Sequence, residues 1–323
     1  SFSNVGGAVK AAGNLILVTG NWRDDANGVM SSGKDLSVQA SEDLRTEGVL
    51  VGGQGLYLDA TGLTNAASGL IATENGTLDL VLNGTGTGEG LSNSGRIEAA
   101  GTGALLDVMT QGNITNSGTL VSQGDVALAA QDLSNSGQVG SLTGQANLTA
   151  ASLLNTGRLV AAEQVNATLT GSAVNTGLIY GTQGINLKSG EQIDNTNGRI
   201  GANGTIAVSG ASLTNMSGDI ITGVGALLVS AAGGVSNEEG GIQAAGDVTL
   251  TAASLDNENA GKIISNAGTL NIQNIGGQAM TLIANNNGAL QAENDIVLVA
   301  NNLNNGSGAL INAVNGSLTI SAG

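Results

Sequence analysis

A short motif centred on asparagine returns along the chain at a nearly constant spacing. "LSNSG" stands at 91–95 and again at 133–137, and looser copies stand at 114–118, 153–157 and 173–177. Each copy has an aliphatic residue, an Asn two positions later and a Gly two positions after that. Aligned on this Asn, the motif occurs at Asn65, Asn93, Asn116, Asn135, Asn155, Asn175, Asn195, Asn215, Asn237, Asn257, Asn285 and Asn305. Most steps are 20 residues long, and a fixed period in this range is the signature of a repeat architecture.

Within each repeat, apolar and polar residues alternate. Between 146 and 150, Ala, Leu and Ala are separated by Asn and Thr, and the same alternation occurs at 125–133, 247–255 and 295–303. A period of two is typical of β-strands, and frequent Gly argues against helices. The pattern therefore predicts short strands bounded by tight turns, with Leu148 pointing inward.

The composition restricts how such strands can pack. The chain has 323 residues with 53 Gly, no Pro, no Cys, no His and only four aromatic residues, so its core must consist of small aliphatic side chains in regular positions. We expect one all-β domain over 1–323, a parallel β-helix (solenoid) with about 20 residues per turn and about 15 turns. Strands of successive turns then stack about 4.8 Å apart and form aliphatic columns.

In such a stack the recurring Asn residues lie above one another. We expect them to be buried and to form a hydrogen-bonded column, which Asn4, Asn27 and Thr46 continue upstream. The following Gly indicates a corner that needs either a positive φ or a close backbone approach. From Asn195 onward the Gly lies three positions after the Asn instead of two, at Gly198, Gly218, Gly240, Gly288 and Gly308, so the corner gains one residue there.

Three segments depart from the regular repeat. The segments 83–90 and 273–280 fall in the two 28-residue steps, and 20–28 carries the only Trp and two adjacent carboxylates. Loops on a rigid scaffold often carry contact residues. The candidate contact residues are Trp22, Asp24, Asp25, Asn83 and Glu89. The alternative is that these segments are plain solvent-exposed irregularities.

Charge and residue types exclude several functions. Nine basic residues against 25 acidic ones give a net charge of −16, and the basic residues are scattered singly, so nucleic acid and anionic membrane surfaces are excluded as partners. No apolar run is long enough to insert into a membrane. Without His or Cys, the sequence predicts no catalytic, cofactor-binding or metal-ligating residue. The adjacent carboxylate pairs do not converge by themselves, because neighbouring strand residues point to opposite faces. A polysaccharide-cleaving β-helix enzyme is the remote alternative.

The motif "LxNxGxI" followed by "G-x-[VIL]-x-L-x-A", clearest over 91–265, resembles the haemagglutinin repeats of filamentous haemagglutinin and of contact-dependent growth inhibition exoproteins. The resemblance implies a right-handed β-helix exported by two-partner secretion, with an outer-membrane transporter as partner during export. It also implies a secreted location at the surface of a Gram-negative cell. The implied role is a structural and adhesive shaft that projects a binding or toxin-bearing region. A segment that contacts a receptor on a target cell is the alternative.

The first and last residues, "SFSNVGGAVK" and "GSLTISAG", stand in mid-pattern without a capping segment. The family's secretion domain carries Asn-Pro-Asn-Gly motifs, and this chain has no Pro. We therefore expect a fragment of a longer filament that similar turns continue on both sides.

Overall fold

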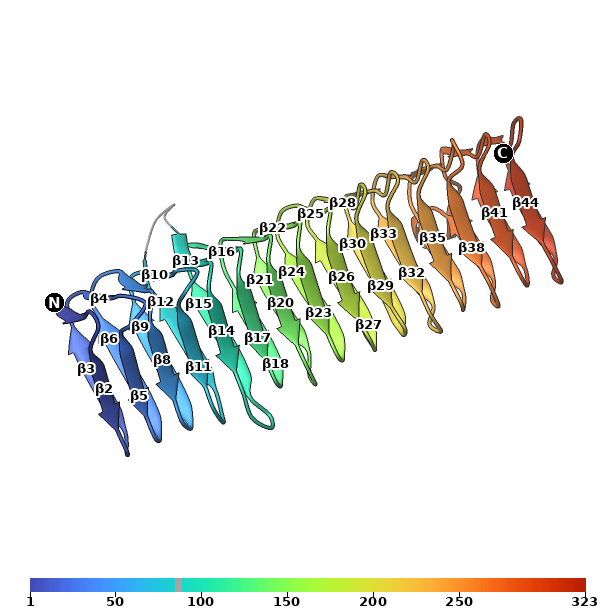
Figure 1. The fold of residues 1–323 in the computed structure, drawn as a ribbon. Coiled ribbons are helices and arrows are strands. Elements are labelled where there is room, and N and C mark those ends of the chain that lie inside the picture. The colour runs from blue at the N-terminus through green and yellow to red at the C-terminus, as the bar shows by residue number, and fades with distance from the viewer. Residues whose placement is uncertain (85–88) are drawn as a thin grey trace. The chain divides into compact units, whose positions relative to one another are not determined.

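A computed structural model describes residues 1–84 and 89–323, with only the backbone described at Glu89. The chain is all-β and winds through about 15 turns of about 21 residues (Figure 1). Each turn contributes one strand to each of three parallel sheets. The chain divides into two compact units, 1–163 and 164–323. The predicted fold, a parallel β-solenoid, is confirmed.

Unit 1 contains the first 23 strands. The first sheet holds β1 (Phe2–Asn4), β4 (Trp22–Asp24), β7 (Leu44–Thr46), β10 (Leu63–Asn65), β13 (Glu89–Asn93), β16 (Asn113–Asn116), β19 (Asp132–Asn135) and β22 (Ser152–Asn155). The second sheet holds β2 (Ala8–Ala11), β5 (Val29–Ser32), β8 (Val49–Gly52), β11 (Leu70–Thr73), β14 (Arg96–Ala99), β17 (Thr119–Ser122), β20 (Gln138–Ser141) and β23 (Arg158–Ala161). The third sheet holds β3 (Leu15–Thr19), β6 (Asp35–Ala40), β9 (Gly55–Ala60), β12 (Leu78–Leu82), β15 (Leu105–Thr110), β18 (Asp125–Ala129) and β21 (Ala146–Ala150).

Unit 2 repeats the same three sheets. The first sheet holds β25 (Ala173–Asn175), β28 (Gln192–Asp194), β31 (Ser212–Thr214), β34 (Gly234–Ser236), β37 (Ser254–Asp256), β40 (Leu282–Ala284) and β43 (Leu303–Asn304). The second sheet holds β26 (Leu178–Gly181), β29 (Arg199–Ala202), β32 (Asp219–Thr222), β35 (Gly241–Ala244), β38 (Lys262–Ser265), β41 (Ala289–Ala292) and β44 (Leu310–Ala313). The third sheet holds β24 (Gln164–Leu169), β27 (Gly184–Ser189), β30 (Thr205–Gly210), β33 (Leu227–Ala231), β36 (Val248–Thr251), β39 (Leu270–Gln273), β42 (Ile296–Ala300) and β45 (Leu318–Ala322).

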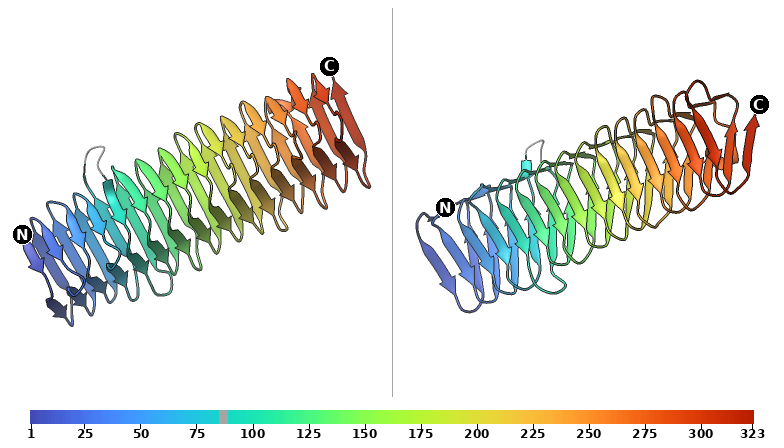
Figure 2. Two further views of the ribbon diagram at one scale, coloured as in Figure 1. Left: turned by 45° about the horizontal axis from the view of Figure 1, so that its top comes forward. Right: turned by 45° about the vertical axis from the view of Figure 1, so that its right-hand side comes forward.

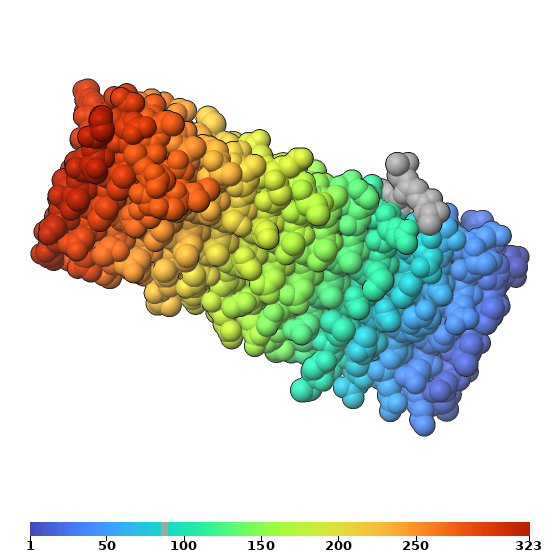
Figure 3. All heavy atoms as spheres, turned by 180° about the vertical axis from the view of Figure 1, so that it is seen from behind, coloured from blue at the N-terminus to red at the C-terminus, as the bar shows by residue number. Residues whose placement is uncertain are grey.

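The core of each unit consists of aliphatic columns that run from turn to turn. Strands of one sheet lie directly beside their equivalents in the next turn (Figure 2), and successive turns form neighbouring bands on the surface (Figure 3). One column in the third sheet is made by Val38, Leu58, Leu80, Val108, Leu128 and Leu148, which are paired in register. Leu148 is 2% exposed, as its place in the alternating pattern predicts. Burying one Leu stabilises a fold by roughly 1.5–3 kcal/mol, so each aliphatic column adds to the stability at every turn it passes.

The corners after the first sheet explain the recurring glycine. A Cβ at Gly118 would lie 2.1 Å from the carbonyl oxygen of Gly95, and one at Gly218 would lie 2.1 Å from that of Asn195. Neither glycine has a positive φ. Of the two reasons that the sequence left open, close backbone approach is therefore the correct one at these corners. In the corners after Asn195, Asn215 and Asn237 the positive φ falls on the residue before the Gly, such as Ser217 with φ 52°.

Two turns are longer than the others, those between Asn65 and Asn93 and between Asn257 and Asn285, and each contains one of the irregular segments. The segment 83–90 includes residues 85–88, which lie outside the described residues. The segment 273–280 forms a 3₁₀ turn, η1 (Ile275–Gly277), whose first amide is capped by the side chain of Asn274. Met280 at the end of this segment is buried and bridges to Ala300, so the chain re-enters the core there. Within the described ranges, no helix has the length and apolar character needed to cross a membrane.

Candidate functional site

The recurring asparagines lie inside the turn, at the end of the first-sheet strand or directly after it. Eleven of the twelve, from Asn65 to Asn285, are at most 2% exposed. Asn305 is exposed. The strands of the first sheet stack in register, so that Asn65 pairs with Asn93 and Asn116 with Asn135. The structure thus brings these side chains together as one column in each unit.

A directional ladder of hydrogen bonds connects the column. In unit 1 the Nδ2 of Asn65 donates to the Oδ1 of Asn93 at 2.8 Å, and the same bond recurs from Asn93, Asn116 and Asn135 to the next turn. In unit 2 the ladder runs in the same way from Asn175 through each turn to Asn305. Each described donor points toward the following turn. The second Nδ2 proton serves backbone carbonyls, so the column satisfies corner groups that burial would otherwise leave bare.

The first residues of the column differ from those that the sequence predicts. Asn4 pairs in register with Asp24 rather than with Asn27, and Thr46 pairs with Asn65. Asn27 lies exposed in the corner after β4. The prediction failed because the corner between Asp24 and Gly28 is two residues longer than the later short corners, which shifts the spacing.

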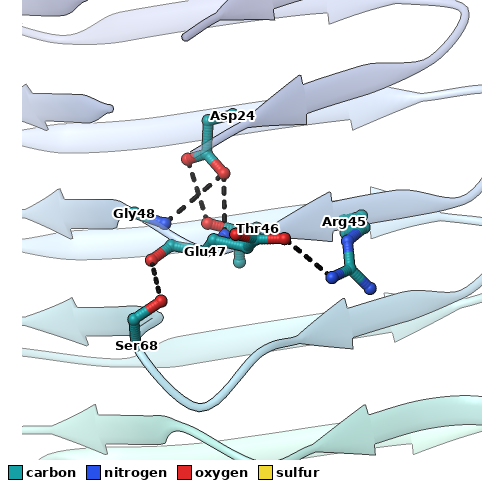
Figure 4. Close-up of polar contacts among 6 residues, drawn as sticks. All are labelled: Asp24, Arg45, Thr46, Glu47, Gly48 and Ser68. Atoms are coloured by element: carbon teal, nitrogen blue, oxygen red, sulfur yellow. Dashed lines mark hydrogen bonds and ion pairs between the residues drawn. The ribbon is translucent and has the colours of Figure 1, made fainter. Parts of the chain in front are cut away.

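Asp24 accepts three hydrogen bonds from the following turn (Figure 4). Its Oδ2 accepts from the Thr46 hydroxyl at 3.0 Å, and its Oδ1 accepts from the amides of Glu47 at 2.8 Å and Gly48 at 3.4 Å. Burial raises the pKa of Asp24 above its usual 3.8, and these hydrogen bonds together with the Trp22 indole act in the opposite direction.

For two of the candidate contact residues the predicted place in an exposed loop is wrong, because both side chains are buried. Trp22 and Asp24 are each 3% exposed, so neither side chain projects from the surface as a contact loop would present it. The reason is that 22–24 is a strand of the first sheet instead of a loop, and the Trp22 ring packs 5.4 Å from that of Phe2.

Of the other three candidate contact residues, Asp25 and Asn83 lie at or near the surface. Asp25 is half-buried and accepts from the amide of Gly6 at 2.8 Å, which lowers its pKa. Asn83 is exposed and donates to Asp59 at 2.8 Å. The side chain of Glu89 lies outside the described residues. Asp25 and Asn83 bind different neighbours, Gly6 and Asp59.

A surface groove of about 590 Å³ lies on the flank of β4 and β7. It is lined by Asn21, Trp22, Arg23, Ser41, Glu42, Asp43, Arg45 and Thr61. Arg23 and Arg45 are register partners on the outer face of the first sheet. Arg45 pairs with Glu47 at 2.7 Å, and Asn21 donates to Glu42 at 3.1 Å. Sequence reasoning missed this groove, although an Arg directly before the column residue in two consecutive turns was a visible signal.

The adjacent carboxylates Glu238 and Glu239 bind different neighbours. Glu238 accepts from Asn259, while its neighbour Glu239 accepts from Ser217 in the preceding turn. On the outer face of the third sheet Asp79 and Asp107 are register partners, and burial raises the pKa of both, with the charge of Asp107 adding to the effect on Asp79. Among the residues whose placement is described, no group of three metal-ligating side chains could hold an ion.

Comparison with protein-family models gives a match along the whole chain. The haemagglutinin repeat model matches residues 4–81, 73–151, 141–197, 190–239, 224–284 and 279–323. The chain belongs to the haemagglutinin repeat family. No curated protein and no solved structure gives a significant match to it.

The haemagglutinin repeats and the turns of the solenoid are related but differ in length. The matched stretches, from 4–81 to 279–323, each cover more than one turn, and successive stretches overlap. The groove residues Arg23 and Arg45 lie inside the first matched stretch, 4–81. The groove is therefore a local variation of a haemagglutinin repeat and not a separate module.

Proposed function

We propose that this chain is a structural and adhesive shaft segment of a large surface exoprotein exported by two-partner secretion. In this role it projects a binding or toxin-bearing region from a Gram-negative cell. The haemagglutinin repeat family consists of secreted surface adhesins, and a β-solenoid fits a shaft. The observation that carries the proposal is the Asn column, because within each unit it connects successive turns, from Asn65 to Asn155 and from Asn175 to Asn305, without depending on any ligand. A shaft needs turns that hold together without a ligand.

The export route is tested in the producing bacterium. The exoprotein is followed by protease treatment of intact cells, with and without the outer-membrane transporter of its secretion pair. We expect the haemagglutinin repeats to be accessible outside the cell only when the transporter is present. Equal surface exposure without the transporter would refute the route.

The shaft role is tested by removing one full turn. Deleting 195–214 joins equivalent positions, because Asn195 and Asn215 occupy the same place in the column. Deleting 195–204 removes half a turn and breaks the register, so it is the matched control. We expect the one-turn deletion to keep surface display and adhesion, and the half-turn deletion to lose both. Loss of adhesion in the one-turn deletion, with display unchanged, would contradict a passive shaft.

A receptor-contacting segment is the second candidate, and the groove favours it. Arg23 and Arg45 stand side by side in a chain that has only nine basic residues. Reversing both charges with Arg23→Glu and Arg45→Glu should abolish binding to target cells if the groove is the contact. Arg96→Glu is the matched control, since Arg96 is an exposed arginine of the same unit that pairs with Glu98 at 2.6 Å. If the groove variants bound target cells as well as the wild type, the receptor-contact hypothesis would be wrong and only the shaft role would remain.

The proposal includes no catalytic step. The haemagglutinin repeat family is typically non-enzymatic, and the adjacent carboxylates diverge instead of facing one substrate. Screening the purified chain for polysaccharide cleavage tests the remaining enzyme hypothesis.

A further inference from the structure

An arginine followed two positions later by a carboxylate occurs three times in unit 1, at 23–25, 45–47 and 96–98. In the second and third copies the two side chains form an ion pair, at 2.7 and 2.6 Å, and Figure 4 shows the second. In the first copy the carboxylate of Asp25 instead accepts from two backbone amides, at 2.8 and 3.1 Å. Within the part of the chain that the structure describes, no side chain pairs with the guanidinium of Arg23.

The groove beside β4 and β7 contains this guanidinium and a second charge of opposite sign. Arg23 lies opposite Arg45 in register, a relation in which like charges destabilise a sheet, and Glu47 balances the charge of Arg45 alone. Asp43 also lines the groove and is exposed, and no residue with a described side chain pairs with it. It stands two positions before Arg45, with the buried Leu44 between them, so it lies on the same outer face as the arginines.

Arg23 and Asp43 are therefore diagonal neighbours across two adjacent turns. Diagonal positions on one face of a sheet lie about 7–8 Å apart, within reach of long side chains. In an extended peptide, two residues that face the same way are separated by roughly 6.6 Å, which is twice the rise per residue of a strand. The groove thus presents one free cation and one free anion at a spacing close to that of positions i and i+2 of an extended chain.

We propose that the groove binds an extended segment of a receptor protein that carries an acidic residue and a basic residue two positions apart. The carboxylate of the partner pairs with Arg23, and its ammonium or guanidinium group pairs with Asp43. This inference rests on the receptor-contacting role given above as the second candidate function, and it names the chemistry that the groove recognises.

The charges of the groove favour such a segment over an acidic sugar. A carboxylated or sulfated sugar could pair with Arg23, but it has no cation for Asp43, and both Asp43 and Glu42 would repel its negative charge. The aromatic residue that lines the groove, Trp22, is 3% exposed and offers no open ring face on which a sugar could stack. The volume of about 590 Å³ lies within the range of ligand sites and can take a pair of side chains.

Fluorescent peptides test this pairing on the whole chain. In the mixed peptide, Glu and Lys alternate with Ser, and in three control peptides the charged positions all hold Glu, all hold Lys or all hold Gln. We expect saturable binding of the mixed peptide by fluorescence anisotropy. Each control peptide should bind at least about tenfold more weakly, because it loses one or both charge-assisted contacts. A sialylated and a sulfated oligosaccharide are measured as competitors of the mixed peptide.

Variants of the groove test which charges are used. Arg23→Gln and Asp43→Asn should each weaken the mixed peptide about tenfold. Arg45→Gln is the matched control in the same groove, and it should have little effect because that guanidinium is already paired.

Releasing a paired arginine tests the same reasoning by a gain of binding. Glu47→Gln frees Arg45 beside Arg23, so the all-Glu peptide should bind about tenfold more tightly to it than to the wild type. Glu98→Gln frees Arg96 on the second sheet, outside the groove, and should give no such gain. If Glu47→Gln gave no gain either, the argument that an ion pair closes the neighbouring guanidinium to a ligand would be wrong.

Three results would overturn the proposal. The mixed peptide could fail to bind the wild type, or bind Arg23→Gln and Asp43→Asn equally well. The all-Glu peptide or one of the oligosaccharides could also match the mixed peptide, which would show that the partner needs no cation. Loss of target-cell binding in the charge-reversed groove variants without any binding of the mixed peptide would refute the mixed-charge segment and keep the receptor role. Peptide binding together with unchanged cell binding would support the pairing and refute the receptor role.

Discussion

Replacing one member of the Asn column tests whether the column holds the turns together. Asn215 is fully buried in unit 2 and accepts from the Nδ2 of Asn195 at 2.7 Å. Its own Nδ2 donates to Asn237 at 2.8 Å and to the carbonyls of Gly218 and Gly241 at 3.0 and 3.2 Å. Asn215→Ala removes all four bonds without adding a charge or a bulky group.

The cost can be worked out bond by bond. The Nδ2 of Asn195 keeps acceptors in its own corner and in Asp219, so it is not orphaned. The Oδ1 of Asn237 loses its donor in a fully buried place, which costs about 2 kcal/mol. The two short bonds within the ladder contribute about 1 kcal/mol each, so the total loss is about 4 kcal/mol. Solenoid stability is close to a sum over neighbouring turns, so the loss should stay local.

Hydrogen exchange resolved by peptide measures this loss directly. About 4 kcal/mol corresponds to about a thousandfold faster exchange by local opening, and we expect this over 195–241. Peptides from residues 1–84 should be unchanged. Met216→Ala is the matched control, since Met216 is the next residue and is 40% exposed. If 195–241 exchanged in Asn215→Ala as slowly as in Met216→Ala, the column would not hold the turns together and the reasoning would be wrong.

Three other substitutions test the remaining parts of the fold. Leu148→Asp places an unpaired charge in an aliphatic column and should cost more than about 4 kcal/mol, seen as fast exchange in the neighbouring turns only. Gly218→Ala brings a Cβ to 2.1 Å from a backbone oxygen and should lower the thermal midpoint, whereas Gly13→Ala, with nothing within 4 Å, should not. Asp79→Asn should stabilise unit 1 at pH 7, because the raised pKa of Asp79 penalises the charged form, and this gain should vanish below pH 3.8 in denaturation measured at both pH values.

The regular part of the fold could be predicted because one physical constraint repeats. The alternation around Leu148 and the steps of 20 residues each reflect a strand and a turn, and neither depends on distant parts of the chain. The burial of Asn135 follows from the same constraint, since stacked turns put identical residues above one another. The positions of the core and of the column therefore follow from the sequence pattern alone.

The start of the chain could not be predicted in the same way. At Asp24 the column residue changes type, and the corner after it is longer, so the spacing alone pointed to Asn27. Trp22 was expected at a contact loop because aromatic residues are rare here, but rarity says nothing about which face of a strand a residue occupies. The pairing of Arg23 with Arg45 likewise requires the register of β4 and β7, which only the backbone fixes.

The two corner types show how the chain varies its turns without losing the column. In the short corner the amides of Ser136 and Gly137 donate backward to the carbonyl of Asn116, at 2.8 and 3.1 Å. In the long corner the positive φ of Ser217 turns its amide forward, and it donates to Glu238 of the following turn at 3.0 Å. Both solutions satisfy the corner amides, and both leave the Asn side chains donating in the same direction. A corner can therefore gain a residue while the side-chain ladder and the aliphatic columns stay in register. Residues that face a partner can then change at the corners and outer faces, while the column continues to carry the connection between turns.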